Sequence, residues 1–176
     1  MASLLARSSR MLESFKVAAA CQHFGGFHGL YHVAGGSGRR MGDGPLHEVT
    51  DDGIRATLAL NLESVILSNR AAVQQFLRQG SGGAILNIGS VLGWSPSARF
   101  FSTHVYAAAK SAVIGFTKSI ASYYAPQGIR ANVLAPAVVE TPMAQRAAGG
   151  GARGVPTLGA LRRAPARKDV APTPAA

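Results

Sequence analysis

The order of apolar and polar positions along this chain predicts helices and strands in turn. Longer stretches with apolar residues on one helical face predict helices over residues 10–24, 50–79 and 103–124. Short apolar runs rich in β-branched and aromatic residues predict strands over residues 29–35, 83–90 and 129–135. Because helices and strands alternate, we expect a parallel sheet with right-handed crossovers and helices on its faces.

Local signals mark where these elements begin and end. A pair of glycines after residue 24 ends the first helix, since glycine terminates helices at low cost. Thr50 and Asp51 are candidate N-caps of the long helix that ends near Gly80. The continuous apolar run at residues 83–90 indicates a strand that is buried on both faces.

The composition of the chain changes after Met143. Residues 146–176 are rich in Ala, Gly, Pro and Arg and have no sustained periodicity. Such a segment cannot bury enough apolar surface to offset the entropy of ordering it. We therefore divide the chain into an N-terminal helical segment (1–28), an α/β domain (29–145) and a disordered basic tail (146–176).

The net charge of +10 is concentrated at the two ends of the chain. Residues 146–176 hold six basic residues and one acidic residue, and residues 1–16 hold three and one, so residues 17–145 carry only +3. A basic domain face is therefore not predicted, and we do not expect nucleic-acid binding. A binding protein that acts through its basic tail remains an alternative.

Cysteine, histidine and hydropathy patterns narrow the class of protein further. The chain has one cysteine, Cys21, and no histidine spacing typical of zinc sites, so neither disulfides nor a metal centre is expected. No apolar run reaches the roughly 18 residues that span a bilayer, so we expect no membrane association and a cytoplasmic protein. The first twelve residues loosely resemble a mitochondrial presequence, which leaves that compartment as an alternative.

Two glycine-rich segments raise the question of nucleotide binding. Residues 149–154, GGGARG, match the spacing G-x-G-x-x-G, but no predicted strand precedes them and no helix follows, so we interpret the match as chance. Residues 29–40, GLYHVAGGSGRR, fit neither that spacing nor the P-loop. On their own they indicate a strand followed by a turn.

Candidate catalytic chemistry lies after the second predicted strand. Tyr106 and Lys110, in YAAAK, are four residues apart at the start of a helix and therefore share one face. An ammonium beside a phenol favours the phenolate, which lowers the pKa of the tyrosine and suits it to proton transfer. Ser90 ends the preceding strand, at the edge where open α/β sheets bind their ligands. The three residues together predict a site for proton transfer.

These motifs, in this order, resemble the short-chain dehydrogenase/reductase family. The resemblance covers about residues 29–143 and rests on LNLES (60–64), NIGS (87–90), YAAAK (106–110) and NVLAPAVVETPM (132–143). It implies an α/β fold with an incomplete Rossmann-like parallel sheet. It also implies hydride transfer between a small-molecule carbonyl/alcohol pair and NAD or NADP, which the sequence does not distinguish.

The resemblance further implies a role for each matching residue. Tyr106 would be the general acid/base, Lys110 would lower its pKa and hold the nicotinamide ribose, and Ser90 would bind the substrate oxygen together with Tyr106. Asn61, which would interrupt the long helix, would anchor a water that relays protons. The residues expected to bind the cofactor are Ala34, Gly35, Tyr106, Lys110, Pro136, Val139 and Thr141.

Departures from the family pattern leave the activity of the chain open. His32 and Val33 replace two asparagines, and Ala137 stands where a glycine usually follows the proline. The family's glycine-rich loop, T-G-x-x-x-G-x-G, is not found before residue 29. The chain could therefore be a working oxidoreductase or a truncated, inactive relative that acts through dimerisation. The family implies a homo-oligomer formed through helices 50–79 and 103–124.

Overall fold

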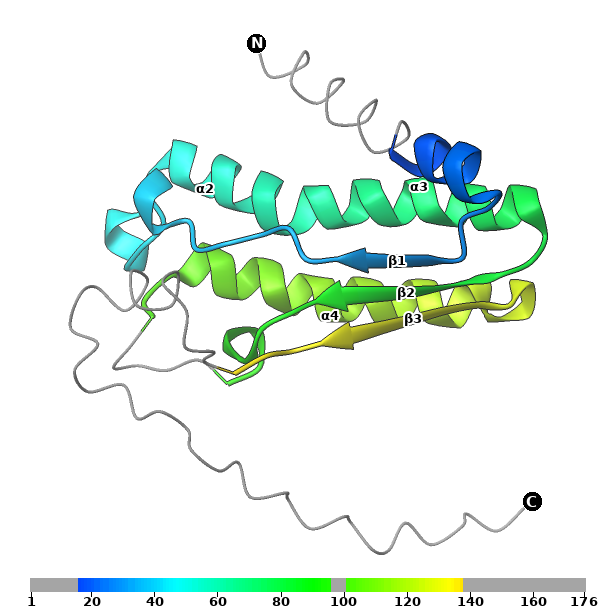
Figure 1. Ribbon diagram of the computed structural model, residues 1–176. Helices are drawn as coiled ribbons and strands as arrows, with labels where there is room; N and C mark the ends of the chain where they lie inside the picture. Colours follow the sequence, from blue (N-terminus) through cyan, green and yellow to red (C-terminus); the bar gives the residue numbers. More distant parts are fainter. Residues whose placement is uncertain (1–15, 96–100, 138–176) are drawn as a thin grey trace, which may run out of the picture.

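The described part of the chain, residues 16–95 and 101–137 of the computed structural model, folds into two layers: a three-stranded parallel sheet and helices on one face of it (Figure 1). The main elements, in chain order, are a helix at residues 16–24, β1 (Gly29–His32), α2 (Asp51–Leu58), a π-helical turn (Ala59–Glu63), α3 (Ser64–Gln79), β2 (Gly83–Ile88), α4 (His104–Tyr124) and β3 (Ile129–Leu134). The strands lie in the order β1-β2-β3. This arrangement confirms the predicted α/β class.

Both crossovers place their helices on the same face of the sheet. The chain steps from β1 to β2 to β3 in one direction, and right-handed crossovers in one direction fall on one side. Figure 1 shows α3 and α4 lying behind the strands on that side. The predicted N-cap of the first crossover is confirmed, because Thr50 Oγ1 accepts a hydrogen bond of 3.0 Å from the backbone N–H of Gly53. The predicted helix over 103–124 is also confirmed, as α4.

An apolar core lies between the sheet and α3. Its buried members are Ala72, Val73, Phe76, Ile85 and Ile129. The ring of Phe27 stacks on that of Phe76 with 5.5 Å between their centroids. Gly83 has no room for a side chain, since a Cβ there would lie 2.4 Å from the Phe76 ring. The Phe76 ring therefore packs directly on the start of β2.

A buried polar network joins β2 to both helices. Asn87 of β2 and Asn69 of α3 exchange two hydrogen bonds, of 2.8 and 3.0 Å. The Asn87 amide also donates to Thr117 Oγ1 of α4 at 3.1 Å. All three side chains are at most 2% exposed. Because buried polar groups are costly unless paired, these bonds favour one register of β2 against its two helices.

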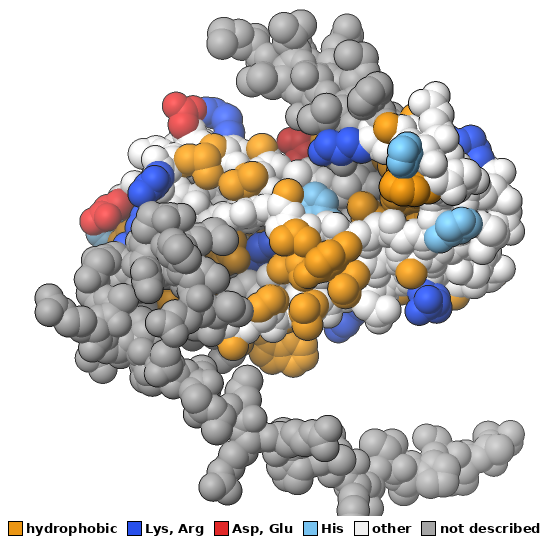
Figure 2. All heavy atoms as spheres, in the orientation of Figure 1, with side chains coloured by type: hydrophobic (Ala, Val, Ile, Leu, Met, Phe, Trp, Pro, Cys, Tyr) orange, Lys and Arg blue, Asp and Glu red, His pale blue; other side chains and the backbone are white. Residues whose placement is uncertain are grey.

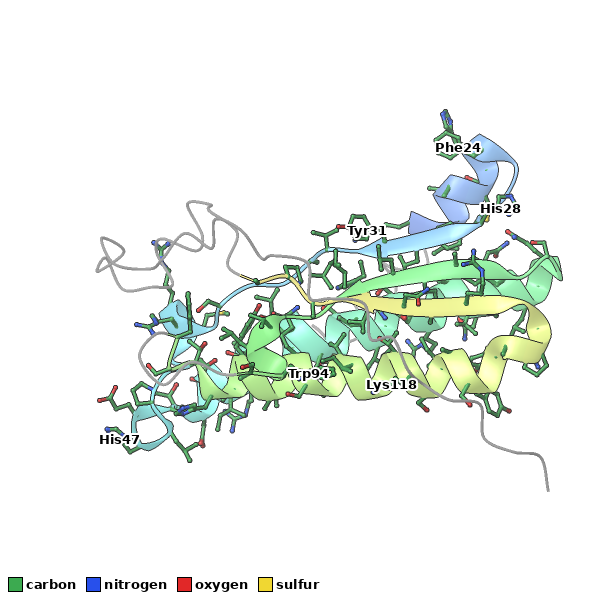
Figure 3. All side chains as sticks on the ribbon, turned by 90° about the horizontal axis from the view of Figure 1, so that it is seen from below. Phe24, His28, Tyr31, His47, Trp94 and Lys118 are labelled. Atoms are coloured by element: carbon green, nitrogen blue, oxygen red, sulfur yellow. The ribbon has the colours of Figure 1, made fainter. Side chains whose placement is uncertain are left out.

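Neither α3 nor α4 covers the second face of the sheet, and the helix at residues 16–24 stands only near the start of β1 on this side (Figure 3). Tyr31, Val33 and Leu134 are 60%, 58% and 51% exposed. Figure 2 shows hydrophobic side chains gathered over the strands on this face, and Figure 3 shows Tyr31 on the side of the sheet opposite α4. The prediction that residues 83–90 form a strand buried on both faces is therefore wrong for this structure. Residues of β2 instead alternate between buried and half-buried, because nothing described covers the second face.

Candidate active site

The predicted site residues converge at the edge of the sheet where the strands end. Gly35 follows β1, Ser90 follows β2 and Pro136 follows β3. Parallel strands bring their carboxyl ends to one edge, which is where ligands bind in open α/β sheets. Tyr106 lies in the first turn of α4 and Lys110 one turn later. The start of α4 thus faces the ends of the strands.

Lys110 is a deeply buried charged side chain at this edge. It is 3% exposed, and its Nζ donates a hydrogen bond of 2.8 Å to the backbone carbonyl of Ile88. Its Nζ lies 5.6 Å from the centroid of the Tyr106 ring. Among the described residues Ile88 supplies the hydrogen-bond acceptor of this ammonium, so two of its three hydrogens are left for a ligand.

Tyr106 and Ser90 interact through their hydroxyl groups. Burial raises the pKa of Tyr106 above its usual value of 10.0, and a hydrogen bond from Ser90 opposes that rise. The net direction is upward, the reverse of what a neighbouring ammonium alone would produce. Burial also lowers the pKa of Lys110 from its usual value of 10.5. In this structure, loss of hydration acts against the charged form of both groups.

Asn61 lies at the centre of the π-helical turn and is fully buried. Its Nδ2 donates to the carbonyls of Gly36, at 2.9 Å, and Thr57, at 3.0 Å. Its Oδ1 accepts from the backbone N–H of Gly36 at 3.0 Å. The side chain therefore holds both backbone polar groups of one residue in the loop after β1.

The wide turn around Asn61 has a local cause that the contacts identify. The backbone N–H of Ser64 bonds to the carbonyl of Ala59, five residues back, in place of the usual partner four residues back. The carbonyl of Leu60, displaced by that change, accepts instead from the Ser64 hydroxyl at 2.7 Å. The predicted single helix over 50–79 is thus interrupted at the residue that reaches the loop.

The backbone of the loop after β1 passes close to the side chains of Asn61 and Lys110 at Gly35. We call this place the cradle. A Cβ on Gly35 would lie 3.0 Å from Asn61 Oδ1 and 3.3 Å from Lys110 Nζ. The loop backbone can therefore approach both groups only because residue 35 is glycine. An uncovered backbone next to a buried ammonium is suited to the hydroxyl groups of a ribose. These residues accordingly fit a nicotinamide nucleotide.

The structure brings together most, but not all, of the predicted residues. Pro136 lies next to the loop that follows Ser90, since its carbonyl accepts a hydrogen bond from the N–H of Val91 at 2.9 Å. Ala34 is exposed beside Gly35. Val139 and Thr141 lie outside the described residues, as does the predicted disordered tail at 146–176.

His32 and Asp43 make contacts at this edge that the sequence did not predict. His32, which replaces a family asparagine, is buried at the end of β1 with its Nδ1 2.7 Å from Ser68 Oγ of α3. Asp43 binds backbone N–H groups of α4 with its carboxylate. Asp43 lies outside every motif quoted above, so the sequence contained no sign of its contacts. For His32, the sequence showed only that it replaces an asparagine of the family pattern.

The described residues lack two further features. No three side chains of the types that hold metals come close enough there to form an ion site. None of the helices described is both long and apolar enough to cross a membrane.

Comparisons with known proteins agree with this geometry. A family model described as short chain dehydrogenase matches residues 8–149. The 2-(R)-hydroxypropyl-CoM dehydrogenase of Xanthobacter autotrophicus is 36% identical over 129 residues, which are 73% of this chain and 50% of that protein. A short chain dehydrogenase from Mycobacterium smegmatis superposes with a TM-score of 0.67 at 29% identity, covering 74% of this chain and 51% of that one. ElxO with NADP bound gives a TM-score of 0.68 at 27% identity, covering 78% and 52%. The chain thus spans about half the length of these relatives.

Proposed function

The chain belongs to the short-chain dehydrogenase family, and from that membership we propose that it transfers a hydride between NAD(P) and a carbonyl or alcohol substrate, with Tyr106 as general acid/base. The family is one of NAD(P)-dependent oxidoreductases, and ElxO has been solved with NADP bound. One observation carries the proposal for this chain: Ser90, Tyr106 and Lys110 meet at the carboxyl edge of the sheet.

Tyr106 is suited to donate a proton to a carbonyl oxygen. A phenol is protonated at neutral pH, which is the form that carbonyl reduction requires, and burial raises the pKa of Tyr106 and so extends that form to higher pH. Ser90, hydrogen-bonded to the same hydroxyl, would bind the substrate oxygen beside it. In the oxidation direction the phenolate is needed, so we expect alcohol oxidation to increase with pH.

Lys110 would bind the ribose next to the nicotinamide. Its bond to the carbonyl of Ile88 fixes the ammonium against the end of β2 and leaves two hydrogens for ribose hydroxyls. Ala34, Gly35 and Pro136, with Val139 and Thr141 beyond the described residues, would complete the protein side of the cofactor site. When bound, NAD(P) supplies or accepts the hydride.

Asn61 would shape the cofactor side of the site and anchor the relay water. Both hydrogens of its amide are committed to backbone carbonyls. A water would therefore bind to an oxygen acceptor of Asn61, either its main-chain carbonyl or the second lone pair of Oδ1. The buried amide would also hold Gly36 and keep the cradle at Gly35 open.

We also propose a homo-oligomer formed through α2, α3 and α4. A shallow hollow of about 360 Å³ lies on the outer side of α2, the π-helical turn and α3. Its lining is mainly apolar and includes Leu58, Leu62 and Ile66. Ile66 is 39% exposed, so burial against a second copy would remove apolar surface from water.

An assay of hydride transfer tests the proposed reaction. The purified chain is mixed with NADPH or NADH and a panel of ketones and aldehydes, and cofactor oxidation is followed at its absorbance band. We expect turnover that falls by about 10²-fold or more in Tyr106→Phe, since general acid catalysis contributes on that scale. Tyr123→Phe is the matched control, because Tyr123 is on the same helix and 72% exposed. Equal turnover in wild type and Tyr106→Phe, or none with any carbonyl, would contradict the proposal.

A further inference from the structure

We propose that Asp43 is a positioning residue for Tyr106: its carboxylate closes the first turn of α4 and so fixes where the phenol stands. The inference rests on the proposed function of Tyr106. Asp43 touches neither the phenol nor a reacting group in the contacts described. It acts through the backbone of the helix that carries Tyr106.

The contacts of Asp43 satisfy backbone groups that a helix normally leaves unpaired. The backbone N–H of Val105 donates to Asp43 Oδ1 at 3.1 Å, and that of Tyr106 donates to Oδ2 at 2.9 Å. The N–H of His104 reaches the carbonyl of Gly44 at 3.5 Å. Helices usually receive such bonds from the side chain of their own N-cap residue. Here the N-cap, Thr103, makes no such bond, and a carboxylate 62 residues upstream of Val105 takes its place.

The loop that holds Asp43 is itself fixed on α2. Asp43 is 3% exposed, and its N–H donates to the carbonyl of Gly38 at 3.0 Å. Gly38 sits so close to Thr57 that a Cβ there would overlap the Thr57 hydroxyl. Gly42 and Gly53 are likewise in backbone contact, with only 2.4 Å between a Cβ on Gly53 and the Gly42 carbonyl carbon. Because three glycines allow this close packing, the carboxylate has little freedom to move.

Tyr106 lies between this cap and a second fixed point on α4. The Ser111 hydroxyl donates to the carbonyl of Gly93, and a Cβ on Gly93 would lie 2.7 Å from the Ser111 backbone nitrogen. Lys110, next to Ser111, is bonded to the end of β2. The helix is therefore held one turn after Tyr106 by β2 and its following loop. Asp43 supplies the fixed point on the other side.

The same loop also reaches the cofactor side of the site. It begins at Gly35 and Gly36, where Asn61 holds the backbone, and ends at the cap on α4. Asp43 thus connects the cradle proposed for the cofactor with the helix that carries the proposed acid/base. This contact sets the distance between the two.

The test compares Asp43→Ala and Asp43→Asn with Asp52→Ala and Asp52→Asn. Asp52 is the matched control because it lies in the first turn of α2 with its side chain 93% exposed. Tyrosinate absorbance is titrated at high pH in each variant and in the same variant carrying Tyr106→Phe, and the difference gives the titration of Tyr106. Amide hydrogen exchange is measured at Val105, Tyr106 and Thr117.

We expect Asp43→Ala to bring the apparent pKa of Tyr106 down toward 10, because a frayed first turn exposes the phenol to water. Exchange at Val105 and Tyr106 should become about tenfold faster or more, since the opening of a frayed helix end costs little free energy, while Thr117 is unchanged. Asp43→Asn keeps one acceptor and should give intermediate values. In an active protein, kcat should fall by about 10-fold to 10²-fold, the scale of a small misplacement of a catalytic group.

The outcomes separate this proposal from the proposed function. Faster exchange with an unchanged titration of Tyr106 would mean that the cap is merely structural, and would overturn the proposal. Unchanged exchange would overturn it as well. If the wild type shows no turnover, the proposed function fails, but the titration and exchange still decide the role of Asp43. If Asp43→Ala does not fold, Asp43→Asn gives the same two readouts.

Discussion

At the scale of single residues, Tyr106 and Lys110 are two ionisable groups that the fold has largely removed from water. Burial raises the pKa of the phenol and lowers that of the ammonium, since in each case the charged form loses hydration. The hydrogen bond from Ser90 offsets part of the shift at Tyr106. The site therefore favours a protonated tyrosine, the form that the proposed acid catalysis requires.

These two shifts predict a stability that rises and then falls with pH. Folded Lys110 holds its proton less tightly than unfolded Lys110, so the free energy of unfolding rises between its lowered pKa and 10.5. Unfolded Tyr106 releases its proton first, so stability falls as the pH rises past 10.0. Urea denaturation from neutral to high pH measures both effects. Lys110→Met should remove the rise and Tyr106→Phe the fall; a rise that persists in Lys110→Met would show that another group causes it.

Motif spacing predicts which residues form the site but not what holds them in place. Ser90, Tyr106 and Lys110 follow from local patterns, because a strand end and a helical repeat fix their relative positions. Asp43 gives no such signal, since it is a single acidic residue among glycines. Its role depends on packing against a helix start 62 residues away, which no local pattern describes.

At the scale of elements, the amide pair of Asn69 and Asn87 connects α3 to β2. The pair is buried and reciprocal, and Thr117 adds α4 to the network. Removing one amide leaves the Oδ1 of the other without its donor in a place that water does not reach, although each Nδ2 keeps a second acceptor. The network therefore favours one alignment of the three elements.

A double-mutant cycle tests how strongly these two amides interact. Asn69→Ala and Asn87→Ala should each lower the free energy of unfolding by about 2–3 kcal/mol, since each leaves a buried polar group unpaired. The double variant should lose less than the sum, with a coupling energy of about 1–2 kcal/mol. Asn132→Ala, at an exposed asparagine of β3, is the control and should change stability by less than about 0.5 kcal/mol. Additive losses would mean that the two amides act independently.

The order and approximate bounds of the elements could be predicted from periodicity, whereas the break in the long helix at Asn61 followed only from the resemblance to the family. Periodicity and an N-cap at Thr50 identify the helix, because both are local properties of the sequence. At that break the Ser64 N–H bonds to the carbonyl of Ala59, and the Asn61 side chain bonds to Gly36, 25 residues earlier in the chain. Neither contact changes the hydrophobic pattern of the helix, so periodicity alone does not reveal the turn.

At the scale of the whole molecule, the described part of the chain buries one face of its sheet and exposes the other. The predicted strand β2 was expected to be covered on both faces, as is usual in parallel sheets. Tyr31, Val33 and Leu134 remain exposed on the second face. A sequence pattern indicates that a strand can be covered, but it does not supply the layer that covers it.

The proposed oligomer predicts a change in mass on substitution in the hollow beside α3. Leu62→Glu and Ile66→Glu place a charge in an apolar contact, so they should shift the protein from an oligomer to the 18.2 kDa chain. Size-exclusion chromatography with light scattering measures the mass. Leu46→Glu is the control, because Leu46 is 74% exposed and lies outside these helices. An unchanged mass in both hollow variants would exclude this surface as the interface.

Cofactor binding tests the central claim most directly, namely that this chain forms a working NAD(P) site around Lys110. The purified chain is titrated with NADPH and NADH by calorimetry, alongside Lys110→Met and Lys118→Met. Lys118 is the matched control, an exposed lysine on the same helix (Figure 3). We predict micromolar binding that Lys110→Met weakens by about tenfold or more, the expected effect of losing charged hydrogen bonds, and that Lys118→Met leaves unchanged. No binding at millimolar cofactor, or equal weakening in both variants, would contradict the account.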